Sequence, residues 1–291
     1  MVGAHTHEKL EFKVFRPNHL APVRFDAQTN MDKMKEFIAK FVNSETVTKE
    51  VGEVANFKAW LPGFQFDNIP QAAIGELIEM VAAAEEKTKI ALIDLTRLLM
   101  LHEAPAAHIL YKHWETFDIS IFQYLLCCDI TDPKNKVIHN YHLVSLKMLG
   151  NIYQTPSGRD FVGEADHSEQ VIKFCEYSFK SANPRTVFAA AVLLFSHVLT
   201  FKGDFRSINA ALQGALSGII ETLPSTTDTE ALGAMLLCEI RILYKNADNL
   251  TWALASKDKI LKVHDALRNK IADDQIKNSI DDLYELIGGK D

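Results

Sequence analysis

The fold of this chain is decided by IALIDLTRLLML (90–101), LVSLKMLGNIY (143–153), FAAAVLLFSHVLTF (188–201) and AMLLCEIRILY (234–244), four apolar helical segments. When the segments are aligned on their apolar rows, one position is polar in each of them, and it holds Arg97, Asn151, His197 and Arg241. These positions are 54, 46 and 44 residues apart. Periods of about 40–47 residues are typical of HEAT and armadillo arrays. The sequence therefore predicts an all-α, armadillo-like solenoid of about six repeats.

The recurring polar residues predict a binding surface, because the same helix of each repeat lines one face of a stacked array. We call these four residues the ladder. Arginine matches carboxylates through its planar fork, and asparagine offers donors and an acceptor to a peptide backbone. We therefore expect Arg97 and Arg241 to bind carboxylates. Asn151 and His197 would hold backbone groups of an extended acidic peptide. Lysines one turn from the ladder would add positive charge, and these are Lys147 and Lys245.

Each ladder residue also has a structural interpretation that the sequence leaves open. Asp94 lies three residues before Arg97 and could pair with it on the same helix. Asn151 and His197 could be buried residues with internal hydrogen-bond partners.

The composition limits the classes of function. The formal net charge is −7, with 31 Lys and Arg against 38 Asp and Glu. This balance argues against nucleic acid as a partner, since such proteins usually carry a strongly basic face. No apolar stretch has the length of a membrane span, and the N-terminus has no signal-peptide core, so we expect a cytoplasmic and nuclear protein without membrane contact.

Motifs of catalysis and metal binding are missing from the sequence. It contains no GxSxG, GxxxxGK[ST], GxGxxG or CxxC pattern. The histidines of LHEAPAAH (101–108) have the wrong spacing for a zinc site, and His139 and His142 have no carboxylate close in sequence. We expect a non-enzymatic protein without cofactor or metal. Its four cysteines, which include the adjacent Cys127 and Cys128, are expected to be buried free thiols in a reducing compartment.

The organisation along the chain favours one domain. Residues 1–24, interrupted by Pro17 and Pro22, predict an extended or partly disordered segment, and residues 25–291 predict the helical array. Ser44 and Asn183 are expected to be helix N-caps, the latter followed by proline at the first helical position. The last helix, within DDQIKNSIDDLYELIGGK (273–290), is acidic, has no ladder residue, and predicts a solvent-facing cap.

The repeats resemble a known family. PVRFDAQTNMDKMKEFIAKF (22–41), ALIDLTRLLMLHEAP, HLVSLKMLGNIYQTPSGRDF, NPRTVFAAAVLLFSHVLTFKGD and EALGAMLLCEIRILYKNADNLTWAL resemble, in order and spacing, the PUL domain. This domain is the C-terminal armadillo-like module of the phospholipase-activating-protein family of ubiquitin adaptors. The resemblance extends from about Phe25 to the last helix.

The resemblance implies a partner. In that family a basic groove binds the acidic C-terminal tail of the valosin-containing AAA ATPase, a segregase of ubiquitinated proteins, and the tail has an aromatic residue near its carboxylate. Arg97 lies where one arginine of the family is expected, whereas Arg241 rests on the repeat register alone. Ubiquitin binding belongs to other domains of the family, which are not in this chain.

Three alternatives are kept open. One is a helical-repeat module that binds nucleic acid, one is a hydrolase with Cys127 or Cys128 as nucleophile, and one is a passive scaffold that makes no contact with the ATPase.

Overall fold

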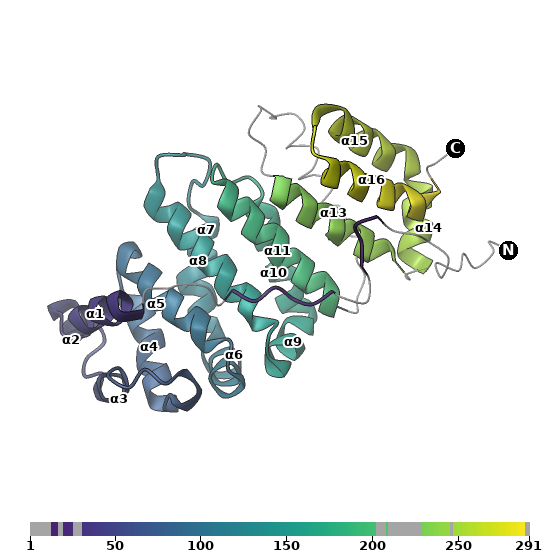
Figure 1. Ribbon diagram of the computed structural model, residues 1–291. Helices are drawn as coiled ribbons and strands as arrows, with labels where there is room; N and C mark the ends of the chain where they lie inside the picture. Colours follow the sequence, from purple (N-terminus) through teal and green to yellow (C-terminus); the bar gives the residue numbers. More distant parts are fainter. Residues whose placement is uncertain are drawn as a thin grey trace.

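The computed structural model describes residues 13–16, 20–25, 31–201, 208, 229–244 and 247–288. Within these residues every regular element is helical and neighbouring helices pack in sequence order, which confirms the predicted all-α helical-repeat solenoid. Figure 1 shows the helices stacked one behind another along the length of the molecule. No helix in the described ranges is both long enough and apolar enough to cross a membrane.

One row of helices runs through the whole array, and each of its members packs against the next. This row consists of α1 (Met31–Val42), α5 (Glu86–Leu99), α8 (Lys136–Ile152), α11 (Pro184–Thr200), α13 (Thr229–Leu243) and α16 (Asp274–Ile287). We call it the ladder row, because the ladder residues belong to it. Within the described residues the row has six members, and the sequence predicts about six repeats.

The other helices connect successive members of the ladder row and pack among themselves, as α4 does with α6, α6 with α9, and α9 with α10. They are α2 (Glu45–Glu50), α3 (Ala55–Trp60), the 3-10 helix η3 (Phe66–Asn68), α4 (Gln71–Ala83), α6 (Glu103–Phe117), the π-helix η4 (Asp118–Gln123), α7 (Tyr124–Leu126), α9 (Pro156–Gly163), α10 (Ala165–Ser178), α14 (Ala247–Ala255) and α15 (Lys257–Lys270). The two layers enclose one continuous apolar core.

Local sequence signals define several helix ends. The Asn183 side chain accepts a hydrogen bond from the Arg185 N–H, and Pro184 begins α11, as predicted. Ser44 caps α2 by accepting from the Val47 N–H. Gly288 ends α16 in the left-handed region, with φ of 62°, where glycine has no Cβ penalty.

The cysteines follow the prediction only in part. Cys175 and Cys238 are buried free thiols, but Cys127 is exposed and Cys128 is half-buried. The run that carries the latter two ends its helix at Leu126, so both thiols lie in the turn after α7 rather than in the core.

The described N-terminal residues form no helix and extend along the ladder row. We call residues 13–16 and 20–25 together the strap. Figure 1 draws it as a dark purple trace that passes across the helices of the row. The strap runs from α16 towards α5, so it lies against repeats that are far away in the sequence.

Candidate functional site

The ladder helices lie side by side, as the period of the sequence predicts. α5 packs against α8, α8 against α11, and α11 against α13. The strap lies along this series. Because its described residues belong to no helix or strand, their N–H and C=O groups need other partners, and side chains of the ladder row provide several of them.

Arg97 and Asn151 meet at one residue of the strap, Phe25. The Asn151 Oδ1 accepts a hydrogen bond from the Phe25 N–H at 2.8 Å, and its Nδ2 donates to the Phe25 carbonyl at 3.0 Å. The same Nδ2 donates to the Arg97 carbonyl at 2.8 Å, which fixes the amide between α5 and α8. The Arg97 guanidinium donates to the Phe25 carbonyl through Nη1 and to the Asp94 carboxylate through Nε, at 2.6 Å.

Arg97 and Asn151 have both of the roles that the sequence left open for them, a structural role and the binding of an extended segment. Arg97 pairs with Asp94 on its own helix, and Asn151 is fully buried. Both nevertheless hold the backbone of an extended segment, which is the task predicted for an asparagine of the ladder. The segment that they hold is part of the same chain.

The neighbouring strap residues are bound in the same way. The Val23 N–H donates to the Ser196 hydroxyl on α11 at 3.2 Å. Gln154, just after α8, donates through Nε2 to the carbonyls of Pro22 and Val23 at 3.3 and 3.2 Å. The sequence analysis identified neither Ser196 nor Gln154.

His197 does not reach the strap, and this corrects the expectation that it faces a peptide. Its side chain is fully buried between layers. The Nδ1 atom lies 2.9 Å from the Tyr153 hydroxyl, and Nε2 lies 2.9 Å from the Ser168 hydroxyl of α10. Burial lowers the pKa of His197 to about 4. The residue before it, Ser196, holds the ladder position on α11.

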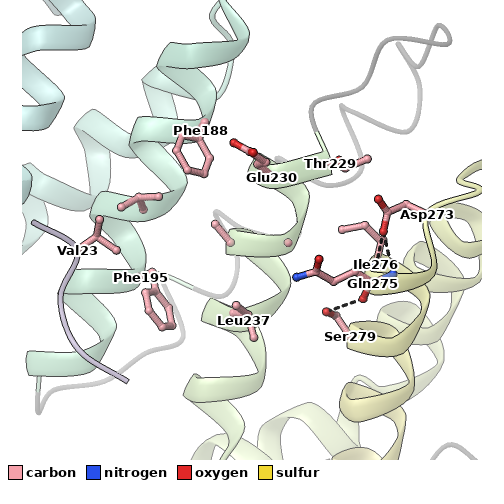
Figure 2. A pocket seen from close by; sticks show the side chains of 13 residues that line it. Val23, Phe188, Phe195, Thr229, Glu230, Leu237, Asp273, Gln275, Ile276 and Ser279 are labelled. Carbon is pink, nitrogen blue, oxygen red and sulfur yellow. Dashed lines mark hydrogen bonds between the residues drawn. The ribbon is translucent and has the colours of Figure 1, made fainter. Parts of the chain in front are cut away.

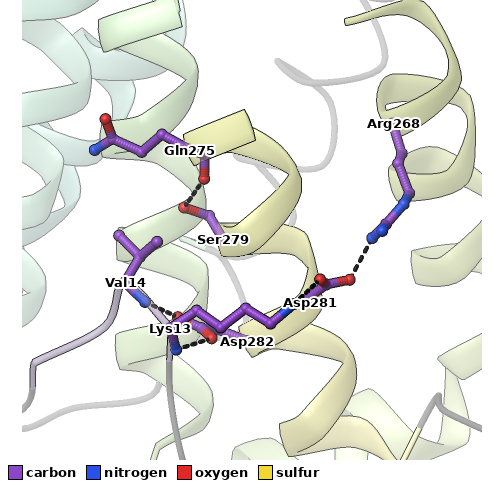
Figure 3. Close-up of polar contacts among 7 residues, drawn as sticks. All are labelled: Lys13, Val14, Arg268, Gln275, Ser279, Asp281 and Asp282. Atoms are coloured by element: carbon purple, nitrogen blue, oxygen red, sulfur yellow. Dashed lines mark hydrogen bonds and ion pairs between the residues drawn. The ribbon is translucent and has the colours of Figure 1, made fainter. Parts of the chain in front are cut away.

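The first part of the strap is anchored on the last helix of the row. The Asp282 carboxylate accepts the backbone N–H groups of Lys13, Val14 and Phe15 at 2.5, 2.7 and 2.9 Å. The neighbouring Asp281 pairs with the side chains of Lys13 and Arg268, as Figure 3 shows. Burial alone would raise the pKa of Asp281, but these two cations lower it. α16 is therefore more than the solvent-facing cap that its acidic sequence predicted.

Phe15 completes this anchor. Its side chain is buried, and its ring contacts the Tyr244 ring edge-on at 5.3 Å between centroids. Tyr244 directly follows α13.

Two of the predicted cations, Lys147 and Arg241, lie on the ladder row. Lys147 is half-buried on α8, and its pKa is lowered by burial and by the charges of Arg97 and Arg185, while Asp94 opposes the shift. Arg241 is half-buried on α13, one turn after Leu237. Among the described residues, no hydrogen bond or ion pair joins the Lys147 ammonium or the Arg241 guanidinium to a protein acceptor. Lys245 lies outside the described residues.

A pocket of about 430 Å³ opens beside the strap, between α11, α13 and α16. Figure 2 shows Val23 at its edge, with Phe188 and Phe195 on one side and Leu237 on the other. Most of its lining is apolar, and Glu230 and Asp273 contribute polar groups. The pocket therefore offers space for an apolar side chain next to a bound backbone.

The histidines and the cysteine that were considered for metal binding or catalysis do not form such a site among the described residues. The His139 ring lies 2.9 Å from the Asp132 carbonyl, and the buried His142 lies 2.8 Å from the Ser178 hydroxyl. Burial raises the pKa of Cys128, which disfavours the thiolate that a nucleophile requires. In the described part of the chain, no three His, Cys, Asp or Glu residues are grouped as metal ligands would be.

The comparisons with known proteins agree with this picture. No curated protein matches the chain as a relative. The family model of the PUL domain matches residues 19–282, so the match includes residues 20–25 of the strap and nearly all of the helical array. PUL domains are protein-interaction domains of adaptors of the AAA ATPase. Because the match spans far more than half of its length, the chain belongs to the PUL domain family.

Proposed function

We propose that the ladder row of this protein binds the acidic C-terminal tail of the valosin-containing AAA ATPase, without enzymatic activity of its own. The protein would serve as an adaptor domain in ubiquitin-dependent protein turnover, in the cytoplasm and the nucleus. Contact with ubiquitin would depend on other domains.

The observation that carries this proposal is the way in which the row holds an extended backbone. Asn151 pairs with both main-chain groups of Phe25, and Ser196 and Gln154 bind neighbouring peptide groups. These contacts involve backbone atoms, which every peptide has. A second extended segment can be recognised by the same groups.

Charge supports an acidic segment. Lys147 lies within electrostatic range of Arg97 and Arg185, and Arg241 lies further along the row. The positive charges of the two arginines disfavour the charged form of Lys147. A bound anion favours that charged form, so the lysine is suited to binding a carboxylate. Lys147 and Arg241 are therefore the side chains that we assign to carboxylates of the tail.

The expected affinity is moderate. Charge-assisted hydrogen bonds contribute roughly 1.5–3 kcal/mol each, and one buried aromatic side chain contributes about 1.5–3 kcal/mol. Association costs at least ~4 kcal/mol. Three charged contacts and one aromatic anchor, each at the upper end of its range, leave at most about −8 kcal/mol, so we expect a dissociation constant of about 1 μM or weaker.

The test is a calorimetric titration of a synthetic tail peptide into the wild-type protein and into Lys147→Glu and Arg241→Glu. The matched control is Lys173→Glu, which makes the same change of charge on α10, where Lys173 is exposed and pairs with Glu169. We expect each of the first two variants to weaken binding at least tenfold, and the control to bind like the wild type. Equal affinities in all four folded proteins would reject the proposal.

A further inference from the structure

The contact between Phe25 and its two polar partners has the form of a carboxylate site. The Phe25 carbonyl oxygen accepts from the Arg97 guanidinium and from the Asn151 amide together. One N–H of a guanidinium, Nη1 of Arg97, and one amide N–H therefore meet at this oxygen, and such a pair of donors suits a carboxylate better than a neutral carbonyl, because hydrogen bonds between ionised groups are shorter and stronger. In this molecule a peptide carbonyl stands where a carboxylate oxygen would fit.

The Phe25 ring lies in a second specific contact. It covers Gly150 on α8, where an added Cβ would come within 2.5 Å of the ring atom Cε2. Glycine in the middle of a helix costs roughly 0.5–1 kcal/mol relative to alanine. At this position it makes room for an aromatic ring directly beside Asn151. The row therefore has adjacent places for an aromatic side chain and for a carboxylate.

From these two contacts we infer that residues 20–25 occupy the place of the partner's tail as an internal ligand. This inference rests on the proposed function. The tail would run in the direction of the strap, put its aromatic side chain over Gly150 and place its terminal carboxylate on Arg97 and Asn151. Residues 20–25 must leave before the tail binds.

The two parts of the strap differ in how firmly they are held. Residues 13–15 give three N–H groups to one buried carboxylate, and Phe15 is buried. In the second part, Ala21, Val23 and Arg24 are exposed, and Phe25 is only half-buried. Residues 20–25 can therefore detach while residues 13–16 stay bound to α16. The strap remains tethered and competes with the tail at high effective concentration.

Hydrogen exchange tests the displacement directly. The amide protons of Val23 and Phe25 are bonded to Ser196 and Asn151, and those of Val14 and Phe15 are bonded to Asp282. We expect saturating tail peptide to speed the exchange of the Val23 and Phe25 amides and to leave the Val14 and Phe15 amides protected. If the tail binds while the Val23 and Phe25 amides keep their protection, the inference is overturned and the proposed function stands.

Two substitutions separate the competing segments. Phe25→Ala removes the ring of the internal ligand and leaves the row intact, so the tail should bind several-fold more tightly. Gly150→Ala fills the place that the aromatic ring of either segment, residues 20–25 or the tail, would occupy. The tail should therefore bind more weakly, although residues 20–25 are also held less firmly. The control for the second change is Gly163→Ala on α9, where an added Cβ meets no atom within 4 Å.

Each outcome of these titrations has one meaning. Tail affinities that are the same for wild type, Phe25→Ala and Gly150→Ala would show that the tail binds elsewhere on the row, which overturns the inference alone. If no variant binds the tail, including Phe25→Ala with its site open, the proposed function fails as well. A synthetic peptide of residues 13–25 should compete with the tail for the Phe25→Ala protein.

Discussion

The side-chain amide of Asn151 pairs with both main-chain groups of Phe25, accepting from the N–H at 2.8 Å and donating to the carbonyl at 3.0 Å. The two residues are 126 positions apart in the sequence. The amide thus provides the pattern of donor and acceptor that a neighbouring β-strand would offer. An extended segment can dock on an all-helical surface because such side chains replace the missing strand.

Removal of this amide should destabilise the protein. Asn151→Ala leaves the buried Arg97 carbonyl and the part-buried Phe25 N–H without their partner. Each unsatisfied buried group costs about 1–3 kcal/mol, so we expect the free energy of unfolding in urea to fall by about 1–3 kcal/mol. Asn43→Ala is the control, because Asn43 is exposed and donates only to the Ala39 carbonyl. Equal stability of the two variants would contradict the role of Asn151.

The anchor on α16 should depend on Asp282. Asp282→Ala removes the acceptor of three consecutive N–H groups, and we expect the Lys13, Val14 and Phe15 amides to lose their protection from hydrogen exchange. Asp274→Ala, an exposed change on the same helix, should leave their protection intact. Persistent protection in Asp282→Ala would mean that burial of Phe15 alone holds the anchor.

His197 should make the protein sensitive to acid. Burial lowers its pKa to about 4, whereas the unfolded chain has a pKa of about 6.5. Below pH 6.5 the unfolded state therefore binds the proton first, and stability falls until the pH reaches about 4. The full effect is about 3 kcal/mol at 1.36 kcal/mol per unit. His197→Gln should flatten this part of a plot of unfolding free energy against pH, and an unchanged slope would contradict the assignment.

The buried pair of His264 and Glu239 should make the protein less stable as the pH rises, which is the opposite of the effect of His197. Burial alone lowers the pKa of His264, but the Glu239 carboxylate, 2.8 Å from Nε2, raises it above the ordinary value. The pair therefore stabilises the fold fully below the unfolded pKa of about 6.5 and loses this effect as the pH rises through the folded pKa. We expect the stability difference between wild type and His264→Gln to shrink as the pH rises above about 6.5. A difference that grows with pH would show that the imidazole is neutral.

The sequence predicts the helical array, and it pairs the positions of Arg97 and Asn151 on neighbouring helices, for a clear reason. Apolar periodicity reports which helices share a core, and the interval of 54 residues between Arg97 and Asn151 corresponds to a direct hydrogen bond between them. Any polar residue that interrupts such a pattern needs a partner in the structure, so its position is informative even when the partner is unknown.

The same reasoning cannot choose between adjacent polar residues. Ser196 and His197 both interrupt the apolar pattern of α11, and one step along a helix rotates the side chain by about 100°. Ser196 therefore reaches the strap, whereas His197 points into the core. A hydroxyl is enough to bind a backbone N–H, so the apolar pattern alone does not identify which of these two polar residues faces the strap.

The strap itself has no signal in a pattern of side chains. Most of its hydrogen bonds with the ladder row run through its backbone, which is the same for every residue type except proline. The Phe25 ring packs over Gly150 because glycine has no side chain there. Asp282 binds residues 13–15 through their peptide N–H groups. Such contacts become visible only when the chain is folded.

The most direct test of the account is an exchange of charges across the row. The acidic tail peptide, and a second peptide in which lysines replace its acidic side chains, are titrated against wild type and Arg241→Glu. We predict that wild type prefers the acidic peptide by at least about tenfold, or 1.4 kcal/mol, and that Arg241→Glu reverses the preference. If folded Arg241→Glu keeps the wild-type preference and affinity, the acidic tail does not bind on the ladder row.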